Sequence, residues 1–535
     1  MTEAAVSLRG PQAAMNPWVV AAAVVVPTFM EVLDTTIAVV ALRYIAGGLS
    51  TAVVDGEWVI TSYLAANAII LPATGWLINR FGRRNYFLAS IAVFTVASGL
   101  CGMATNLYQL ILFRAIQGLA GGGLQPCSQG VLLDAFPREK QGVAMTLFGL
   151  AALIAPVVGP TLGGWITDNY SWRWVFYINL PVGLLASAAC YAVVHDPEYL
   201  TAQRAEQKRQ GSRFDSIGFS LLVTTMICWE VMLSKGEEWN WLGDAFGRVQ
   251  TLLTLFIAAL GGLIFWEMHH RSPVVNFRPL GERNFSACCI IIFGAYAVLY
   301  GYSTLLPGLL QSLFGYNALQ AGLVMSPAGF FAILTLPVVA RVLGRPTDAR
   351  WVILAGLLTM AVSNYWMSQL NLDISPGQAV WPRVVMIVGL SICFAPANVA
   401  AYLYTPKELR AAAVGLFSLL RNEGGSVGTS LSQALQDHRE QFHTLRLGEN
   451  LDPFNPSVQS FLEQSKAFFL QQTGDPALSQ ELAWQALESL RQQQASSLAY
   501  FDCFWVFAVL MLALVPFVLL MKRSVAEKGA RIGGE

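Results

Sequence analysis

Long apolar stretches, separated by short polar connections, run through nearly the whole chain. Each stretch is about 20 residues or longer, which is the length that a helix needs to cross a bilayer. We therefore predict an all-α integral membrane protein with fourteen spans, at about residues 17–42, 56–78, 85–104, 106–134, 142–167, 173–194, 215–234, 249–268, 285–313, 318–341, 351–369, 380–404, 411–436 and 498–521.

The basic residues decide the orientation of these spans. Lys and Arg gather in the cytoplasmic connections of membrane proteins. Most of the 33 Lys and Arg residues lie near the two termini and in the connections that follow even-numbered spans. An even number of spans puts both termini on one side of the membrane. We therefore expect a multi-pass protein with both termini in the cytoplasm.

The spans divide into groups of six, two and six. A charged segment at 195–213 follows the first six spans and predicts a cytoplasmic linker. We expect an N-terminal six-helix half at 1–194, the linker with two extra spans at 195–270, and a C-terminal six-helix half at 271–535. Transporters are commonly built from two such repeated halves.

One connection is much longer than the others and falls on the outer side, at 437–497. Segments 457–472 and 477–496 are rich in Gln, Glu, Leu and Phe, a pattern that indicates amphipathic helices. Two arrangements remain open. The helices either form a lid on the outer face of the transporter or provide a docking surface for a partner.

Composition excludes several classes of protein. Charged residues make up 12% of the chain, against about 25% in soluble domains. The net charge is zero, so no footprint for nucleic acid is present. The eight Cys lie in apolar stretches and the five His in polar connections, so we expect no disulfide framework, metal site, cofactor or enzyme active site. Any proton carrier inside the membrane must then be a carboxylate.

Acidic residues within the spans are therefore the main candidates for chemistry. Glu31 and Asp34 lie three residues apart in the first span and should share a helical face. Intramembrane acids are costly and usually line an ion or proton pathway. Asp34 and Arg114 each lie about 12 Å from the outer surface, so the two can pair. Glu423 is the second-half candidate for a proton site, and the alternative for all three acids is a structural role.

The fifth span carries a Pro- and Gly-rich motif. Gly159 and Gly163 form a GxxxG spacing that lets another helix approach closely. Pro156 and Pro160 remove backbone donors and kink the helix. With Gly164, these residues form the candidate helix for antiport.

A short basic turn follows the second span. Gly75, Arg80, Gly82, Arg83 and Arg84 form a Gly-led turn with three arginines. Arginine side chains at this position can reach acids and carbonyl groups at the ends of neighbouring helices. We interpret the turn as a cytoplasmic gate.

Five further residues within the spans are candidates for lining a substrate cavity, with helix packing as the alternative role. They are Asn67, Phe293, Tyr296, Tyr300 and Arg421. Arg421 and Glu423 lie two residues apart and point to different faces, so they should not pair with each other. Glu230 is close to the end of its span, and we expect it at the membrane interface.

Several stretches together resemble one family over nearly the whole chain. They are LDTTIAVVAL in the first span, WVITSYLAANAIILPATGWL at 58–77, FRAIQG at 113–118, GPTLGGWITDNYSWRWVFYINLPVG at 159–183, the region 284–323 and RNEGGSVGTS at 421–430. The chain resembles the major facilitator superfamily, specifically its fourteen-span drug:proton antiporter branch of the EmrB/QacA type. The resemblance implies two six-helix halves plus two extra central spans.

The resemblance also implies a function. It implies proton-driven export of amphiphilic drugs or toxic small molecules across the bacterial inner membrane. In double-membraned bacteria it implies a tripartite pump with a periplasmic adaptor and an outer-membrane channel. An exporter dedicated to one metabolite, such as a siderophore or fatty acid, is the alternative within transport. A non-transporting receptor or scaffold is the alternative outside it.

The chain departs from the family pattern at three positions. Asn79 stands where the superfamily usually has Asp in the basic turn, Arg43 where this branch usually has Pro, and Glu230 where it often has Gln. The first departure weakens the expected pairing at the cytoplasmic gate. The other two are candidates for tuning the choice of substrate.

Overall fold

A computed structural model describes residues 16–56, 58–136, 141–197, 200–201, 215–270, 273–343, 347–373, 375–406, 409–449, 451–452 and 454–524. These ranges contain helices and no β-strand, which confirms the expected all-α class. Most of the predicted linker at 195–213 lies outside them, as do the basic residues Arg9, Arg138, Lys140, Arg204, Lys208, Arg209 and Arg213.

The first half of the chain forms one group of helices. They are α1 (Pro17–Gly48), α2 (Val53–Gly56), α3 (Trp58–Phe81), α4 (Arg83–Met103), α5 (Leu107–Gly121), α6 (Leu124–Ala135), α7 (Gln141–Asn169), α8 (Trp174–Tyr177) and α9 (Asn179–Val193).

The remainder of the chain forms the central pair and the second group. The helices are α11 (Ser216–Lys235), α12 (Arg248–His269), α13 (Arg283–Ser312), α14 (Ala318–Met325), α15 (Pro327–Leu343), α16 (Ala349–Ser368), α17 (Pro376–Leu403), α18 (Arg410–Gly448), α19 (Pro456–Thr473), α20 (Pro476–Ala513) and α21 (Val515–Leu520).

Local sequence explains where several helices begin. The side chains of Asn16, Asn455 and Asp475 each accept a hydrogen bond from a backbone N–H in the first turn of α1, α19 and α20. Each cap is followed by a proline, whose fixed φ suits the first helical position and whose missing N–H costs nothing there. These Asx–Pro pairs define the helix starts.

The predicted span at 106–134 is interrupted. It forms two helices, α5 and α6, that meet at Gly122 and Gly123. A Cβ atom at Gly122 would lie 2.7 Å from the backbone oxygen of Asn67 on α3. The glycines therefore allow α3 to approach closely at this point, and the long apolar stretch that predicted one helix did not reveal the break.

Eleven candidate membrane spans are found among the described residues, by helix length and apolar composition. The other three predicted spans fall on α5 with α6, on α7, and on α18. For these three the count of fourteen remains a prediction.

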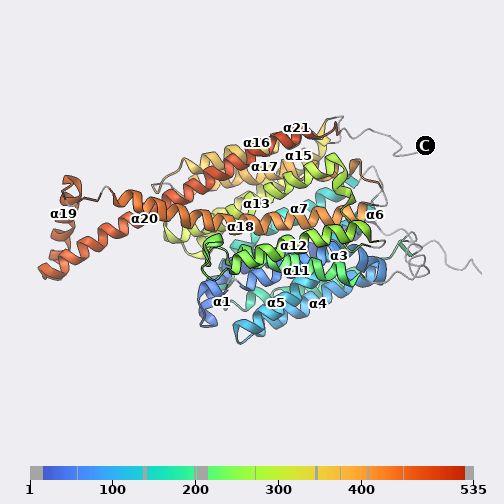
Figure 1. Ribbon diagram of the computed structural model, residues 1–535, viewed down its shortest axis with the longest axis horizontal. Helices are drawn as coiled ribbons and strands as arrows, with labels where there is room; N and C mark the ends of the chain where they lie inside the picture. Colours follow the sequence, from blue (N-terminus) through green and yellow to red (C-terminus); the bar gives the residue numbers. More distant parts are fainter. Residues whose placement is uncertain are drawn as a thin grey trace, which may run out of the picture.

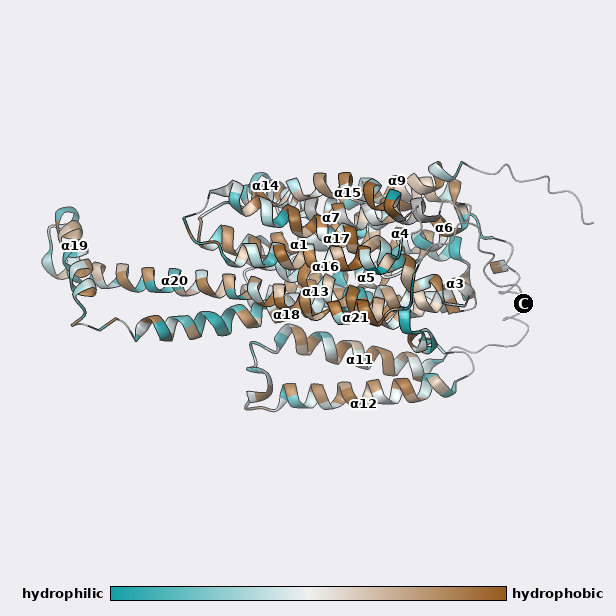
Figure 2. Cartoon of the chain, turned by 90° about the horizontal axis from the view of Figure 1, so that it is seen from above, coloured by the Kyte–Doolittle hydropathy of each residue, from teal (hydrophilic) through white to brown (hydrophobic). Residues whose placement is uncertain are grey.

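The long helices run side by side along one axis (Figure 1). Viewed at right angles, α11 and α12 lie along one side of the main bundle (Figure 2). Two hydrogen bonds fasten α11 to both halves. Thr61 Oγ1 on α3 donates to Ser234 Oγ at 2.7 Å, and Ser430 Oγ on α18 donates to the carbonyl oxygen of Leu233. The central pair therefore lies where the two halves meet.

The two halves are also joined where α7 meets α14. Thr161 Oγ1 donates to the carbonyl oxygen of Gly322 at 2.7 Å. Asp168 accepts from Tyr44 Oη at 2.5 Å and from the backbone N–H of Leu319 at 3.2 Å. One carboxylate on α7 thus links α1 of the first half to α14 of the second half.

The predicted outer segment at 437–497 is an arm rather than a separate domain. Helices α18 and α20 continue beyond the bundle, and α19 packs against α20 at the far end (Figures 1 and 2). Asp502 accepts hydrogen bonds from Arg439 Nε at 2.6 Å and lies 2.7 Å from His443 Nε2, which joins the two helices at the base of the arm. The arm points away from the bundle, so the lid arrangement is wrong.

The arm gives a direct test of topology. A reporter that is active only in the periplasm, fused after Gly474 in the exposed turn between α19 and α20, should be active because the charge bias places this segment outside the cytoplasm. A fusion after Leu200, in the expected cytoplasmic linker, should be inactive. The reverse pattern of activity would reject the predicted orientation.

Candidate functional site

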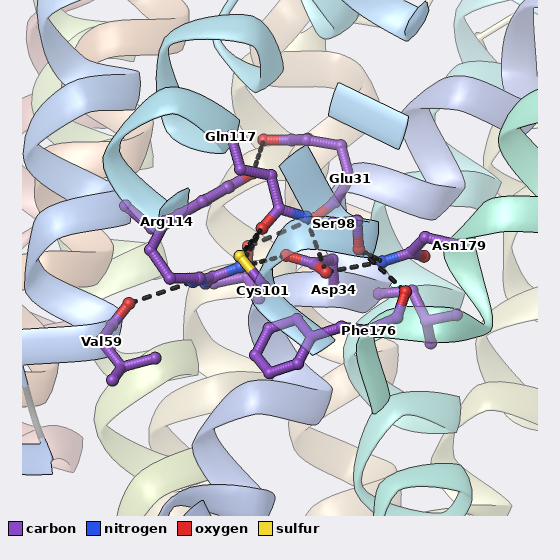
Figure 3. A network of polar contacts seen from close by, with 12 residues as sticks. Glu31, Asp34, Val59, Ser98, Cys101, Arg114, Gln117, Phe176 and Asn179 are labelled. Atoms are coloured by element: carbon purple, nitrogen blue, oxygen red, sulfur yellow. Dashed lines mark hydrogen bonds and ion pairs between the residues drawn. The ribbon is translucent and has the colours of Figure 1, made fainter. Parts of the chain in front are cut away.

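Asp34 lies at the centre of a polar network inside the first half (Figure 3). Its carboxylate accepts hydrogen bonds from Arg114 Nη1 at 2.5 Å, Gln117 Nε2 at 3.0 Å and Asn179 Nδ2 at 2.6 Å. The side chains of Asp34 and Arg114 are both fully buried. Two helices, α5 and α9, thus supply a charged partner and two amide donors to one carboxylate on α1.

The predicted pairing of Asp34 with Arg114 is confirmed. Arg114 also donates from Nε to the carbonyl oxygen of Val59 at 3.0 Å, and its guanidinium lies 4.2 Å from the Tyr63 ring centre. Removing one partner of a buried ion pair typically costs about 3–5 kcal/mol, since the other charge is left uncompensated. This network therefore holds α1, α3 and α5 together.

Glu31 belongs to a second network that faces the other half of the protein. Its carboxylate accepts from Gln125 Nε2 at 2.5 Å, Asn67 Nδ2 at 3.2 Å and Tyr63 Oη at 3.4 Å. Arg421 on α18 donates to the amide oxygen of the same Gln125. Glu31 is therefore held by neutral donors, with a cation one step further away.

The interface between the halves continues from this network. Asn422 Nδ2 on α18 donates to Asn67 Oδ1 at 3.0 Å. The Arg421 guanidinium lies 5.5 Å from the ring centre of Tyr296 on α13. Polar side chains from α1, α3, α6, α13 and α18 thus meet at one place, where a substrate held between the halves would contact both.

The five residues proposed as cavity liners take different positions. Asn67, Tyr296 and Arg421 belong to this shared network, and the Tyr300 ring stacks beside Tyr296 with centroids 6.3 Å apart. The backbone of Phe293 instead packs against Gly424, where a Cβ would overlap its carbonyl oxygen.

Sequence reasoning missed several members of the two networks. They are Tyr63, Gln117, Gln125, Asn179 and Asn422. All are polar residues, and four of them stand among apolar neighbours within predicted spans. A polar residue within an apolar span could have identified them, because an unpaired amide or hydroxyl inside a membrane is costly and therefore needs a partner.

The Pro- and Gly-rich helix packs directly on the acid-bearing part of α1. A Cβ at Gly159 would overlap the hydroxyl of Thr36 and lie 2.8 Å from its Cβ. A Cβ at Gly163 would lie 3.2 Å from Ile37 Cγ2. Further along α7, Gly164 is buried and its carbonyl oxygen accepts from Thr167. The side chain of Pro156 lies outside the described residues, whereas Pro160 is buried beside the contact with α14.

The basic turn makes its contacts within the first half. Gly82 has φ +89°, a conformation that favours glycine, and it separates α3 from α4. Arg83 Nη1 pairs with Asp134 at the end of α6, and Arg84 Nη2 donates to the carbonyl oxygen of Tyr191 on α9 at 2.9 Å.

The described contacts of the turn with neighbouring helices do not come from its other members. Arg80 is exposed, and a Cβ at Gly75 would meet no atom within 4 Å. The side chain of Asn79 lies outside the described residues. The contacts described for this turn thus tie helix ends together inside one half.

Glu423 and Glu230 both lie in the protein interior. Glu423 on α18 is 6% exposed and Glu230 on α11 is 3% exposed. Burial inside the protein does not fix the depth of Glu230 in the membrane, so its expected position at the membrane interface stays a prediction. The contact of α11 with α18 covers this side chain, and the sequence did not reveal that contact.

The second half contains a counterpart of Arg114 that sequence reasoning missed. Arg383 lies seven residues after the start of α17, as Arg114 does in α5, and it is also fully buried. Its Nη2 donates to Ser303 Oγ on α13 at 3.1 Å, and its guanidinium lies 5.1 Å from the Tyr302 ring centre. A hydroxyl thus stands where the first half has a carboxylate. Comparison of the two halves of the sequence would have found it.

Comparison with known proteins decides the family. Residues 25–429 match the family model described as Major Facilitator Superfamily. The chain belongs to this superfamily. The match covers α1 through most of the spanning part of α18, so both polar networks fall within the shared region.

Individual members of the superfamily extend this result. The chain is 36% identical over 460 residues to the multidrug export protein EmrB of Haemophilus influenzae, covering 86% of this chain and 88% of that protein. It is 34% identical over 498 residues to EmrB of Escherichia coli, covering 92% and 93%. It is 33% identical over 494 residues to the fatty acid resistance protein FarB of Neisseria gonorrhoeae, covering 92% and 94%.

Solved structures support the fold. A bacterial homologue of the human lysosomal transporter Spinster, in an inward-facing and unoccupied conformation, gives a TM-score of 0.55 at 15% identity and covers 96% of this chain and 97% of that one. The human organic anion transporter MFSD10 gives 0.56 at 12% identity, covering 95% and 100%. At these identities the likeness concerns the fold alone.

The contact between α7 and α1 can be tested by substitution. Gly159→Leu should abolish transport while the protein still inserts, because the new side chain has no space beside Thr36. Overpacking of this kind costs about 1–3 kcal/mol and displaces the helix. Transport by purified protein in vesicles would measure the loss.

The matched control is Gly261→Leu on α12, where a Cβ would meet no atom within 4 Å. This variant should transport as the wild type does. Equal activity of both variants would show that the close contact at Gly159 has no role in the cycle.

Proposed function

We propose that this protein exports amphiphilic small molecules from the cytoplasm in exchange for protons, at the inner membrane of a bacterium and with both termini cytoplasmic. The observation that carries the proposal is the placement of two buried carboxylates on α1. Asp34 is ion-paired within one half, and Glu31 is hydrogen-bonded in a network that joins both halves. The EmrB relatives, which are named for multidrug export, support the substrate class.

Asp34 is the proposed coupling residue. Its ion pair with Arg114 is compatible with an ionised carboxylate, and protonation would weaken the hold on α5. Loss of this hold is a local change that can alter how α1 packs against its neighbours. Since α1 also packs against Gly159 of α7, the change would reach the helix that contacts the second half.

Glu31 is the proposed link between substrate and proton. It lies at the meeting point of the halves with Gln125 and Arg421, where a bound molecule would replace some of these contacts. A cationic group would favour ionised Glu31, and an anionic group would compete for Arg421. One network can therefore hold substrates of either charge.

A single proton supplies enough energy for useful export. A charge that moves down about 100 mV gains roughly 2.3 kcal/mol. Because about 1.4 kcal/mol corresponds to a factor of ten, one proton could sustain a gradient of about fifty-fold for a neutral substrate.

Export of one metabolite class is the second candidate. FarB, which is named for resistance to fatty acids, matches this chain over 94% of its own length. Two buried arginines outside the Asp34 ion pair, Arg421 and Arg383, supply positive charge to which a carboxylate could bind. A fatty acid and an amphiphilic drug differ in headgroup charge, so competition assays would distinguish the two.

We also propose that the arm docks a periplasmic adaptor, through which an outer-membrane channel completes a tripartite pump. The arm points away from the bundle, yet it carries exposed large apolar side chains. These include Leu445 at 74% exposed, Phe468 at 56% and Trp484 at 45%. Exposed apolar surface of this kind commonly marks a protein–protein contact.

The coupling residue is tested in proteoliposomes under an imposed pH gradient. Asp34→Asn cannot exchange a proton, so gradient-driven efflux should fall to the level of protein-free vesicles while substrate binding persists. Glu31→Gln should cause a milder loss of several-fold, because its amide can still accept from Gln125.

The control is Glu463→Gln on the exposed surface of α19, which should behave as the wild type. If Asp34→Asn retains gradient-driven efflux at the wild-type rate, Asp34 is not the coupling residue. If the wild type shows no response to the gradient, proton exchange itself is rejected.

The docking proposal is tested by separating transport from assembly. Trp484→Glu combined with Leu445→Glu should abolish co-purification of the adaptor, since a charge disrupts an apolar contact. Efflux from proteoliposomes, which needs no adaptor, should be unchanged.

Phe246→Glu is the matched control, because Phe246 is 84% exposed in the connection between α11 and α12, which we expect on the same side of the membrane. It should retain the adaptor. Normal co-purification of the double variant would place the contact elsewhere.

A further inference from the structure

A second pair of buried acids lies apart from the two networks on α1. Glu230 on α11 and Glu423 on α18 are almost fully buried and interact electrostatically across the contact between their helices. One acid therefore comes from the extra central pair and the other from the second half. Figure 2 shows α11 lying alongside the bundle next to α18.

The pair is poorly supplied with hydrogen bonds. Ser426 lies beside Glu230, and the indole of Trp229 lies beside Glu423. Among the described residues, no hydrogen bond of ordinary geometry reaches either carboxylate oxygen of Glu423 or the Oε1 oxygen of Glu230. Asp34, by contrast, accepts three. The surroundings of Glu230 and Glu423 therefore lack the hydrogen-bond donors that would stabilise two ionised carboxylates.

The cations nearest to the two acids along α18 and α11, Arg421 and Lys235, are engaged elsewhere. On α18, Arg421 donates to Gln125 and lies over Tyr296 of α13. On α11, Lys235 Nζ pairs with Glu238 at 2.6 Å. The opposing acids are therefore not neutralised by these two side chains.

The titratable groups of the surrounding helices also face other partners. Tyr63 on α3 and Tyr300 on α13 lie near Glu31, Glu267 on α12 lies near Asp215, and Asp502 on α20 binds Arg439. Ser234, beside the pair on α11, is bonded to Thr61 of α3. The two glutamates are thus each other's main electrostatic neighbour.

Two carboxylates facing each other in a low-dielectric interior cannot both be ionised at reasonable cost. We propose that Glu230 and Glu423 hold one exchangeable proton between them, which makes the interface of the central helix pair with the second half a second proton-binding site. The proposal rests on the proton-coupled export proposed above. It adds one proton to those that move in each transport cycle.

The position of α11 gives this proton a mechanical consequence. The residues that follow Glu230 are bonded to α3 through Ser234 and to α18 through Leu233, so α11 bridges the halves. When the halves move relative to each other, the distance between the two carboxyl groups changes. A pair that is pulled apart no longer shares its proton, and the proton is exchanged with water on the side that opens.

The number of protons moved per substrate tests the proposal. In proteoliposomes, the substrate gradient at which net flux reverses under a known proton gradient gives this ratio. Glu230→Gln and Glu423→Gln should each lower it by about one proton, and the variant with both changes should lower it by no more, because coupled acids titrate as a unit. Glu230→Asp, which keeps a carboxyl group, should restore the ratio.

Labelling with a hydrophobic carbodiimide gives an independent readout, since the reagent attacks protonated carboxyl groups within the membrane. Mass spectrometry of the full-length protein in detergent should find the adduct on Glu230 or Glu423, with less labelling as the pH rises. Glu463→Gln, on the exposed surface of α19, is the control and should leave both the ratio and the labelling unchanged.

Three outcomes separate the possibilities. A wild-type ratio in both single variants, with coupled export intact, would overturn this proposal and leave the proposed function standing. Weaker binding of cationic substrates at an unchanged ratio would show a substrate contact in place of a proton site, and would also overturn it. Absence of coupled export in the wild type would instead reject the proposed function.

Discussion

A charge buried among apolar helices must be met by an opposite charge or by several hydrogen-bond donors, because hydrocarbon supplies neither. The structure depends on how this constraint is satisfied at the Asp34–Arg114 ion pair. Its partners come from α1, α3, α5 and α9, so the pair fixes the interior of one half. Glu31, one helical turn away, is held by neutral donors and joins that half to the other.

Much of this arrangement could be predicted from sequence. Span positions follow from apolar length, and the pairing of Asp34 with Arg114 follows from their equal depth. The separation of Glu31 from Asp34 into different networks could not be predicted, because spacing along a helix says nothing about which neighbours reach each side chain. The burial of Glu230 could not be predicted for the same reason. Its burial depends on α18, which lies almost two hundred residues away in sequence.

The two halves are alike in fold and unlike in chemistry. Arg114 and Arg383 occupy matching places on α5 and α17, but one faces a carboxylate and the other a hydroxyl. The first half therefore has a partner that can gain or lose a proton, and the second half keeps a fixed positive charge. At these matching places a proton can therefore change the partner of Arg114 but not the partner of Arg383.

Helix α18 runs without interruption from the network shared by the two halves into the arm, so a tilt at one end moves the other end. The helix carries Arg421 and Glu423 within the bundle and runs without a break to Gly448. About 25 residues separate Glu423 from that end, a length of about 38 Å at 1.5 Å per residue. A tilt of about 10° at the network would therefore swing the far end of α18 by about 7 Å. Events at a few buried atoms are thereby amplified into a displacement large enough for a neighbouring protein to sense.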